Sequence, residues 1–282
     1  ARPASYRRTR RTIMRKAMLG LFLVVPLAWA GAAFSAEAPP ARQQGIGGTV
    51  KVQANSVMRL PKRAQELRLR RVEIGEDAAL LIPLEVSVLR IEELHMAKNA
   101  RIGVAPGEER ISIEVVSGRL ADGSIISAPG ATGTFRQSAG NGRDLTLRLQ
   151  AVEVESLLLD ARGGVGAPGY DGLDGASGKA SGCLWGSALK GGDGQSGSDG
   201  GPGGAGGRIR LEVPGDFPLE RLQTRLQGGV GGAGGKAGKP GAADNATGCW
   251  IYSVDAGRAG RSGEDGANGT NGSDGSLDVV RF

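Results

Sequence analysis

Glycine recurs at every third position in four separate stretches of this 282-residue chain, and few folds accommodate such a pattern. We name these stretches run 1 (163–178), run 2 (191–206), run 3 (229–241) and run 4 (257–275). A period of three matches an extended helix with three residues per turn, in which a ridge of glycine lets neighbouring backbones approach closely. The runs therefore predict extended helices that pack against one another along their glycine ridges.

Three arrangements satisfy this period. A collagen triple helix uses abundant imino acids, whereas the runs contain only Pro168, Pro202 and Pro240. A flexible linker rich in glycine needs no strict period. We favour the third arrangement, a bundle of polyglycine II helices contributed by a single chain. The collagen-like trimer and the disordered segment stay open as alternatives.

The glycine-rich sequence is duplicated. Residues 163–166 align with residues 228–231, and Cys183 aligns with Cys249. Each copy leaves an apolar β-type segment, passes through triplets to a cysteine, and returns through further triplets to another β-type segment. This order predicts two hairpin insertions, at 163–207 and at 228–275.

The remainder of the chain predicts short β-strands. Apolar and polar residues alternate between 49 and 162, as expected for strands with one buried face. An offset of about 22 residues places Val72 and Ile74 on Leu94 and Met96, and Leu80 on Ile102. Such a repeat favours an all-β fold, a short parallel β-helix, that continues at 208–227 and ends in a strand at 276–282. A β-sandwich with collagen-like or disordered glycine-rich segments is the alternative.

The first 36 residues predict export. A basic stretch precedes an apolar run from Met18 to about Ala30 and small residues near Ala36, which is the pattern of a signal peptide. Residues 37–48 then form a linker. The formal charge of +6 belongs to this leader, because its seven basic residues leave 28 basic against 29 acidic residues. We expect an exported protein in the periplasm, at the cell surface or outside the cell, with no nucleic-acid partner and with membrane contact only during export.

The two cysteines and their aromatic neighbours form the candidate site. In an exported chain, an even pair of cysteines predicts one disulfide, here Cys183–Cys249. Trp185, Trp250 and Tyr252 stand close to these cysteines, where they either bind a glycan or protein partner or cover the disulfide.

No catalytic or metal-binding motif accompanies them. The chain has one histidine, His95, and we expect neither an enzyme, a cofactor nor a metal. A polysaccharide-active enzyme, with Glu92, Glu93 and Glu114 lining a groove together with Arg90, is the alternative. Aspartates recur in the runs, and we expect them to be solvated surface carboxylates; these are Asp171, Asp174, Asp193, Asp199, Asp265 and Asp274.

The triplets, their duplication and the aromatic-bearing turns resemble glycine-rich polyglycine II proteins, which include bacterial collagen-like secreted proteins. The resemblance covers residues 163–275. It implies an exported, non-enzymatic protein with a structural or adhesive role, whose turns contact a surface glycan or an extracellular protein. We expect a monomer, and a trimeric collagen-like fibre component is the alternative.

Overall fold

The described part of the chain is all-β. The computed structural model describes residues 47–62, 65–182, 187–245 and 257–282, which fall within one compact unit, 43–282. Within these residues the only helical element is the single 3₁₀ turn η1 (Leu219–Arg221). The prediction of an all-β fold is therefore confirmed.

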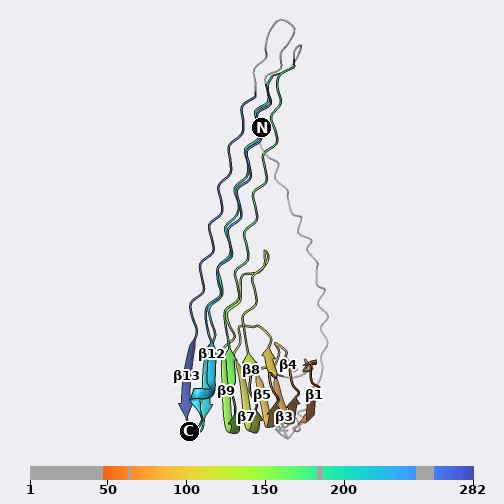
Figure 1. Ribbon diagram of the computed structural model, residues 1–282, viewed down its shortest axis with the longest axis vertical. Helices are drawn as coiled ribbons and strands as arrows, with labels where there is room; N and C mark the ends of the chain where they lie inside the picture. Colours follow the sequence, from red (N-terminus) through yellow and green to blue (C-terminus); the bar gives the residue numbers. More distant parts are fainter. Residues whose placement is uncertain (1–46, 63–64, 183–186, 246–256) are drawn as a thin grey trace, which may run out of the picture. The chain divides into compact units, whose positions relative to one another are not determined.

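The strands form two parallel sheets, and successive strands alternate between them (Figure 1). The seven-stranded sheet contains β1 (Gly47–Val52), β3 (Glu66–Ile74), β5 (Val88–Met96), β7 (Ile111–Leu120), β9 (Leu145–Val154), β11 (Arg208–Val213) and β13 (Ser276–Arg281). The six-stranded sheet contains β2 (Val57–Arg59), β4 (Ala79–Ile82), β6 (Arg101–Val104), β8 (Ser124–Ser127), β10 (Leu157–Asp160) and β12 (Leu222–Arg225).

The strand register confirms the 22-residue repeat. Val72 pairs with Leu94 and Ile74 with Met96 between β3 and β5, and Leu80 pairs with Ile102 between β4 and β6. All pairings between named strands in the described residues are parallel, which disagrees with the antiparallel sheets of a β-sandwich.

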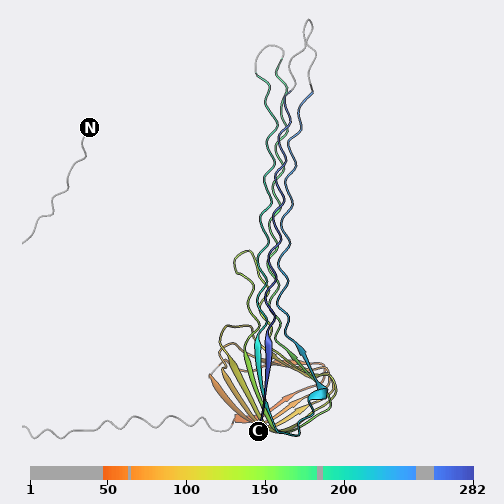
Figure 2. The ribbon, with the colours of Figure 1, turned by 90° about the vertical axis from the view of Figure 1, so that its left-hand side faces the viewer.

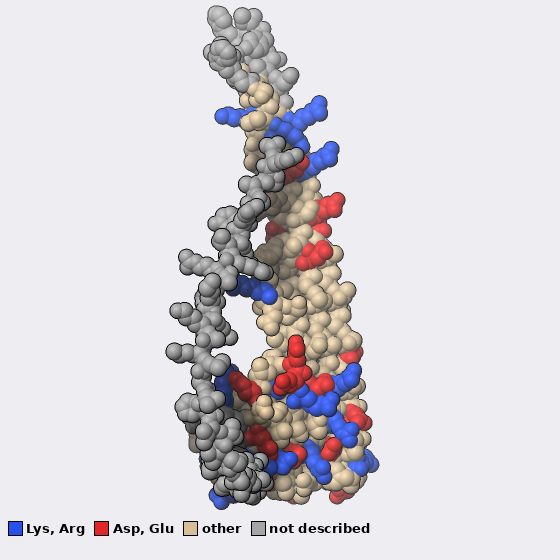
Figure 3. Space-filling view, turned by 180° about the vertical axis from the view of Figure 1, so that it is seen from behind, with Lys and Arg blue, Asp and Glu red and all other residues tan. Residues whose placement is uncertain are grey.

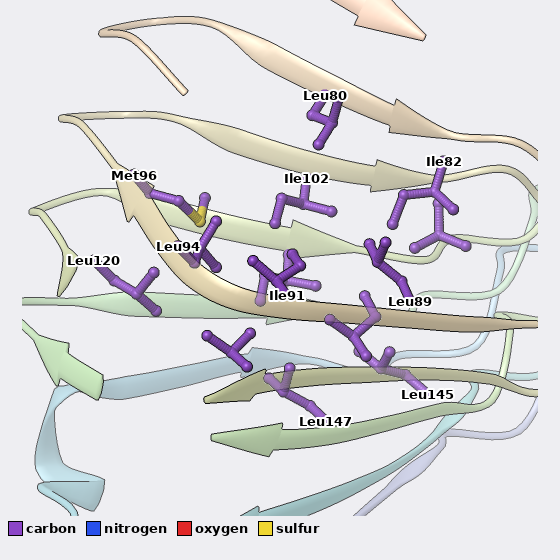
Figure 4. Packing of buried hydrophobic residues seen from close by; sticks show 14 of the residues in the cluster. Leu80, Ile82, Leu89, Ile91, Leu94, Met96, Ile102, Leu120, Leu145 and Leu147 are labelled. Atoms are coloured by element: carbon purple, nitrogen blue, oxygen red, sulfur yellow. The ribbon is translucent and has the colours of Figure 1, made fainter. Parts of the chain in front are cut away.

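One apolar core fills the space between the sheets. Because side chains alternate across a strand, one face of each strand points into this core and the other points to solvent. Leu80, Ile91, Leu94 and Ile102 are fully buried there, and Figure 4 shows them interdigitating between the strands.

The turns between the sheets also repeat. Asn55, Asp77 and Asn99 adopt left-handed conformations with φ of 54°, 51° and 56°, and Gly123 occupies the corresponding turn after β7 with φ of 74°. Asparagine and aspartate tolerate this conformation better than other residues with a side chain. The Asn99 Nδ2 donates to Asp77 Oδ1 at 3.0 Å, which links two successive turns.

The glycine runs lie side by side and are joined by backbone hydrogen bonds (Figures 1 and 2). Runs 1 and 2 connect β10 to β11, and runs 3 and 4 connect β12 to β13. In run 1 every third N–H, as in Gly166 and Gly169, donates to a carbonyl of run 3, here Val230 and Ala233. The same spacing joins run 2 to run 1, run 2 to run 4, run 3 to run 2, and run 4 to run 3.

A shorter glycine-rich segment was not anticipated. Residues 128–144 were expected among the β coils, but no strand forms between β8 and β9. Instead Gly130 and Gly133 donate to the carbonyls of Arg162 and Val165 at the base of run 1, and Gly164 donates to Gly140. In the sequence, only the triplet spacing of Gly130 and Gly133 indicated that this segment could pack against the runs.

The buried guanidinium of Arg143 anchors this segment. It donates to the backbone carbonyls of Leu84, Val86, Ala105 and Glu109 at 2.6–3.3 Å. Burial lowers the pKa of Arg143, because desolvation disfavours the charged form. These bonds tie the loops after β4 and β6 to the start of β9.

Substitution of a buried glycine should unfold the runs. Gly232 is buried, and a Cβ there would overlap the backbone carbonyl of Ala167. We predict that Gly232→Ala lowers the free energy of unfolding by about 3 kcal/mol or more, because the backbones would have to separate. Chemical denaturation of the full chain measures this change.

Gly201→Ala is the matched control. A Cβ at Gly201 would meet its nearest neighbour, the Ala167 nitrogen, at 3.3 Å, and the same ridge of run 2 carries the side chains of Gln195 and Ser198. We expect Gly201→Ala to lower the free energy of unfolding by about 1 kcal/mol or less. Equal losses in the two variants would contradict the packing described here.

Candidate functional site

The predicted site residues lie outside the described residues. These residues are Cys183, Trp185, Cys249, Trp250 and Tyr252, in the segments 183–186 and 246–256. Their pairing and their binding role therefore stay predictions.

The described residues that flank these segments lie together at one end of the runs. Lys179 and Leu189 exchange backbone hydrogen bonds of 3.0 and 2.7 Å, Gly178 donates to Ala242, and Gly191 donates to Arg258. We call this the outer end. The described residues on either side of both segments are therefore found at this end.

Exposed basic residues lie near the outer end, within runs 3 and 4 and directly next to the ends of runs 1 and 2 (Figure 3). We name this set the basic collar: Lys179, Lys190, Lys236, Lys239, Arg258 and Arg261. In the described residues only Lys190 of this set forms an ion pair, with Asp193 at 2.9 Å. The ammonium of Lys190 and the N–H of Arg261 donate to Asp193 and lower the pKa of its carboxyl.

The aspartates of the runs lie on the surface, as expected, and they also accept backbone hydrogen bonds, which was not anticipated. Asp171 and Asp174 of run 1 accept the N–H groups of Lys236 and Lys239, both at 2.7 Å. The other four aspartates named above accept N–H groups in the same way from Arg261, Ala267, Ala237 and Gly228. Backbone donors that face no carbonyl are thus satisfied by side chains.

Four side chains of run 4, spaced three residues apart, form a row of such acceptors. Asp274, Asn271, Asn268 and Asp265 accept from Gly228, Gly231, Gly234 and Ala237, each three residues apart. Continuing the register pairs the next position, Pro240, with Ser262. Proline has no backbone N–H, so the residue opposite Pro240 does not need a side chain that accepts a hydrogen bond.

Sequence reasoning also missed an exposed aromatic pair. Phe135 of the short segment stacks on Tyr170 of run 1, with ring centroids 3.9 Å apart and an interplanar angle of 18°. Both rings are more than half exposed, at 56% and 58%. Because the segment was expected among the β coils, nothing in the sequence placed Phe135 beside run 1.

Glu93 and Glu114, two of the three carboxylates of the enzymatic alternative, are in ion pairs on the outer face of the seven-stranded sheet. Arg90 lies 3.1 Å from Glu114, and Arg71 lies 3.3 Å from Glu93. His95 Nε2 lies 2.7 Å from Glu93 Oε1, and this hydrogen bond lowers the pKa of the Glu93 carboxyl.

The described residues contain neither a metal-binding cluster nor a membrane-spanning helix. No three His, Cys, Asp or Glu side chains among them are grouped so as to hold a metal ion. The same part of the chain contains no helix with the length and hydrophobicity needed to cross a membrane.

Loss of the acceptor row should weaken the bundle. Asn268→Ala combined with Asn271→Ala leaves the N–H groups of Gly231 and Gly234 without their partners, and we expect a loss of about 1–2 kcal/mol in the free energy of unfolding. Ser262→Ala in the same run should change it by less than about 0.5 kcal/mol. Denaturant titration of the three proteins tests this, and an unaffected double variant would show that water replaces the side chains.

Comparison of the chain with protein-family models, with curated proteins and with solved structures finds no match in any of the three.

Proposed function

We propose that the chain is an exported, non-enzymatic protein with a structural or adhesive role at the cell surface or outside the cell. In this proposal the two sheets form a short parallel β-helix, and the glycine runs fold as polyglycine II hairpins inserted between its coils. The alternation of successive strands between two parallel sheets supports the β-helix. The three-residue spacing of the inter-run hydrogen bonds supports the polyglycine II helices.

The observation that carries the function is the hydrogen-bond network of the runs. Donors at every third residue bond to neighbouring runs, and the non-glycine side chains are mostly exposed. At about 3.1 Å per residue, run 1 extends about 45 Å from its first to its last glycine. Such a bundle is suited to holding its outer end at a distance from the sheets.

The aromatic residues beyond the outer end are the proposed contact site. Trp185, Trp250 and Tyr252 offer flat apolar faces with polar edges, which suit a sugar ring or a protein surface. A Cys183–Cys249 disulfide would join the two hairpins there, and closing a loop of about 66 residues stabilises by about 4 kcal/mol in the chain-entropy model. The leader sequence at 1–36 is consistent with the oxidising compartment that such a bond requires.

The collagen-like trimer makes a different prediction. The hydrogen bonds described here join runs of one chain, so we expect the purified protein to sediment as a monomer. Sedimentation equilibrium measures its mass, and a stable trimer would favour the collagen-like alternative.

Removal of the tryptophans tests the adhesive role. We predict that Trp185→Ala with Trp250→Ala abolishes adhesion of the protein to a glycan array or to cells, because the apolar faces are lost. The unfolding temperature should stay unchanged, and mass spectrometry under non-reducing conditions should still find Cys183 and Cys249 joined. A lower unfolding temperature with adhesion retained would instead assign the tryptophans to packing.

A further inference from the structure

Every Asn-Gly and Asp-Gly dipeptide of the chain takes part in the same kind of hydrogen bonding. There are three Asn-Gly dipeptides, at Asn141, Asn268 and Asn271, and seven Asp-Gly dipeptides. In each of them the side-chain oxygen of the Asn or Asp accepts a hydrogen bond, and the N–H of the following glycine donates one. The partners lie in a distant segment of the chain, so these bonds exist only while the fold is closed.

In run 4 these bonds hold two asparagines against run 3. Asn268 Oδ1 accepts the N–H of Gly234 at 2.9 Å. The N–H of Gly269 donates to the Gly232 carbonyl at 2.8 Å. Asn271 and the glycine after it are held in the same way, by bonds of 3.0 Å and 2.9 Å. Both asparagines are exposed, so water has access to them.

An unrestrained Asn-Gly dipeptide deamidates by attack of its own backbone. The glycine nitrogen loses its proton and bonds to the side-chain carbon Cγ of the asparagine, whose amide nitrogen leaves as ammonia. Water then opens the resulting succinimide ring at either carbonyl and gives aspartate or isoaspartate. A following glycine favours the attack because it has no Cβ to obstruct it. Asparagine is accordingly among the thermolabile residue types.

The closed bundle holds both groups that would form the new bond. The nitrogen of Gly269 keeps its proton in the bond to Gly232. The side chain of Asn268 is held by the neighbouring run, so both bonds have to break before the attack. We propose that Asn268 and Asn271 are latent deamidation sites, unreactive in the closed bundle and reactive when run 4 separates from run 3. This inference does not depend on the adhesive role.

The two products of the reaction differ in their effect on the runs. Aspartate retains the acceptor oxygen, and Asp265 and Asp274 already fill equivalent positions in the same row. Isoaspartate instead adds one carbon atom to the main chain, which displaces the following glycines from the carbonyls to which they donate. Formation of isoaspartate should therefore prevent run 4 from closing again.

Peptide mass spectrometry of the full chain at mildly alkaline pH measures the reaction at each asparagine. We predict that Asn268 and Asn271 deamidate about a hundredfold or more slower in native buffer than in guanidinium chloride, because only the open fraction reacts. Gly232→Ala forces the runs apart at the Gly269 bond and should accelerate the reaction in native buffer by about fiftyfold or more. Gly201→Ala, the matched control, should accelerate it by about fivefold or less. Comparable rates in native buffer and in denaturant, or equal acceleration by the two variants, would overturn the proposal.

A second measurement does not require Gly232→Ala to fold. The unsubstituted chain is deamidated in denaturant and returned to native buffer, where its isoaspartate-bearing fraction should stay open to limited proteolysis in run 4. The variant Asn268→Asp with Asn271→Asp carries the same added charge without the added carbon atom, and it should resist proteolysis as the parent does. Equal behaviour of the two proteins, whether cleaved or resistant, would contradict the effect assigned to isoaspartate.

Discussion

The arrangement of the glycine-rich segments depends on one requirement, that backbone N–H and C=O groups find partners in neighbouring segments. An extended helix with three residues per turn makes no hydrogen bonds within itself, so its stability has to come from its neighbours. Buried glycines such as Gly229 and Gly232 allow that contact, because a Cβ at either position would overlap a backbone carbonyl. Each glycine loses more conformational freedom on folding than other residues do, and the ladder of inter-run hydrogen bonds offsets that cost.

The same requirement explains the polar residues of the runs. Donors that face no carbonyl are met by Asp, Asn or Ser side chains, as when Ser196 Oγ accepts from Glu264. Pro240 removes a donor at the level where the acceptor row of run 4 has ended. The aspartates are therefore placed by the backbone of the neighbouring run.

Much of the β-structure could be predicted from the sequence, because alternation and the 22-residue offset depend on local pattern. The pairing of Leu80 with Ile102 follows directly from that offset. The acceptor role of Asp171 could not be predicted, since it depends on the register of run 1 against run 3, which are separated by about 64 residues along the chain. The short segment around Phe135 was missed for a related reason. Two triplets are too few to show a period, and its hydrogen-bond partners lie in run 1.

The sheets determine how the four runs are aligned along one another, because the glycine repeat alone does not determine this alignment. A repeat of three permits many equivalent alignments, each shifted by one triplet, with little difference in backbone bonding. At the base, Gly207 donates to Ala161 directly after β10, and Gly275 donates to Leu226 directly after β12. The strand pairs β10 with β12 and β11 with β13 therefore fix the starting point of all four runs. A shift by one triplet would leave the base bonds unmade, and the shift that set Pro240 opposite Asp265 would also leave that carboxylate without a backbone donor. The parallel sheets therefore select one alignment and determine which residues meet at the outer end.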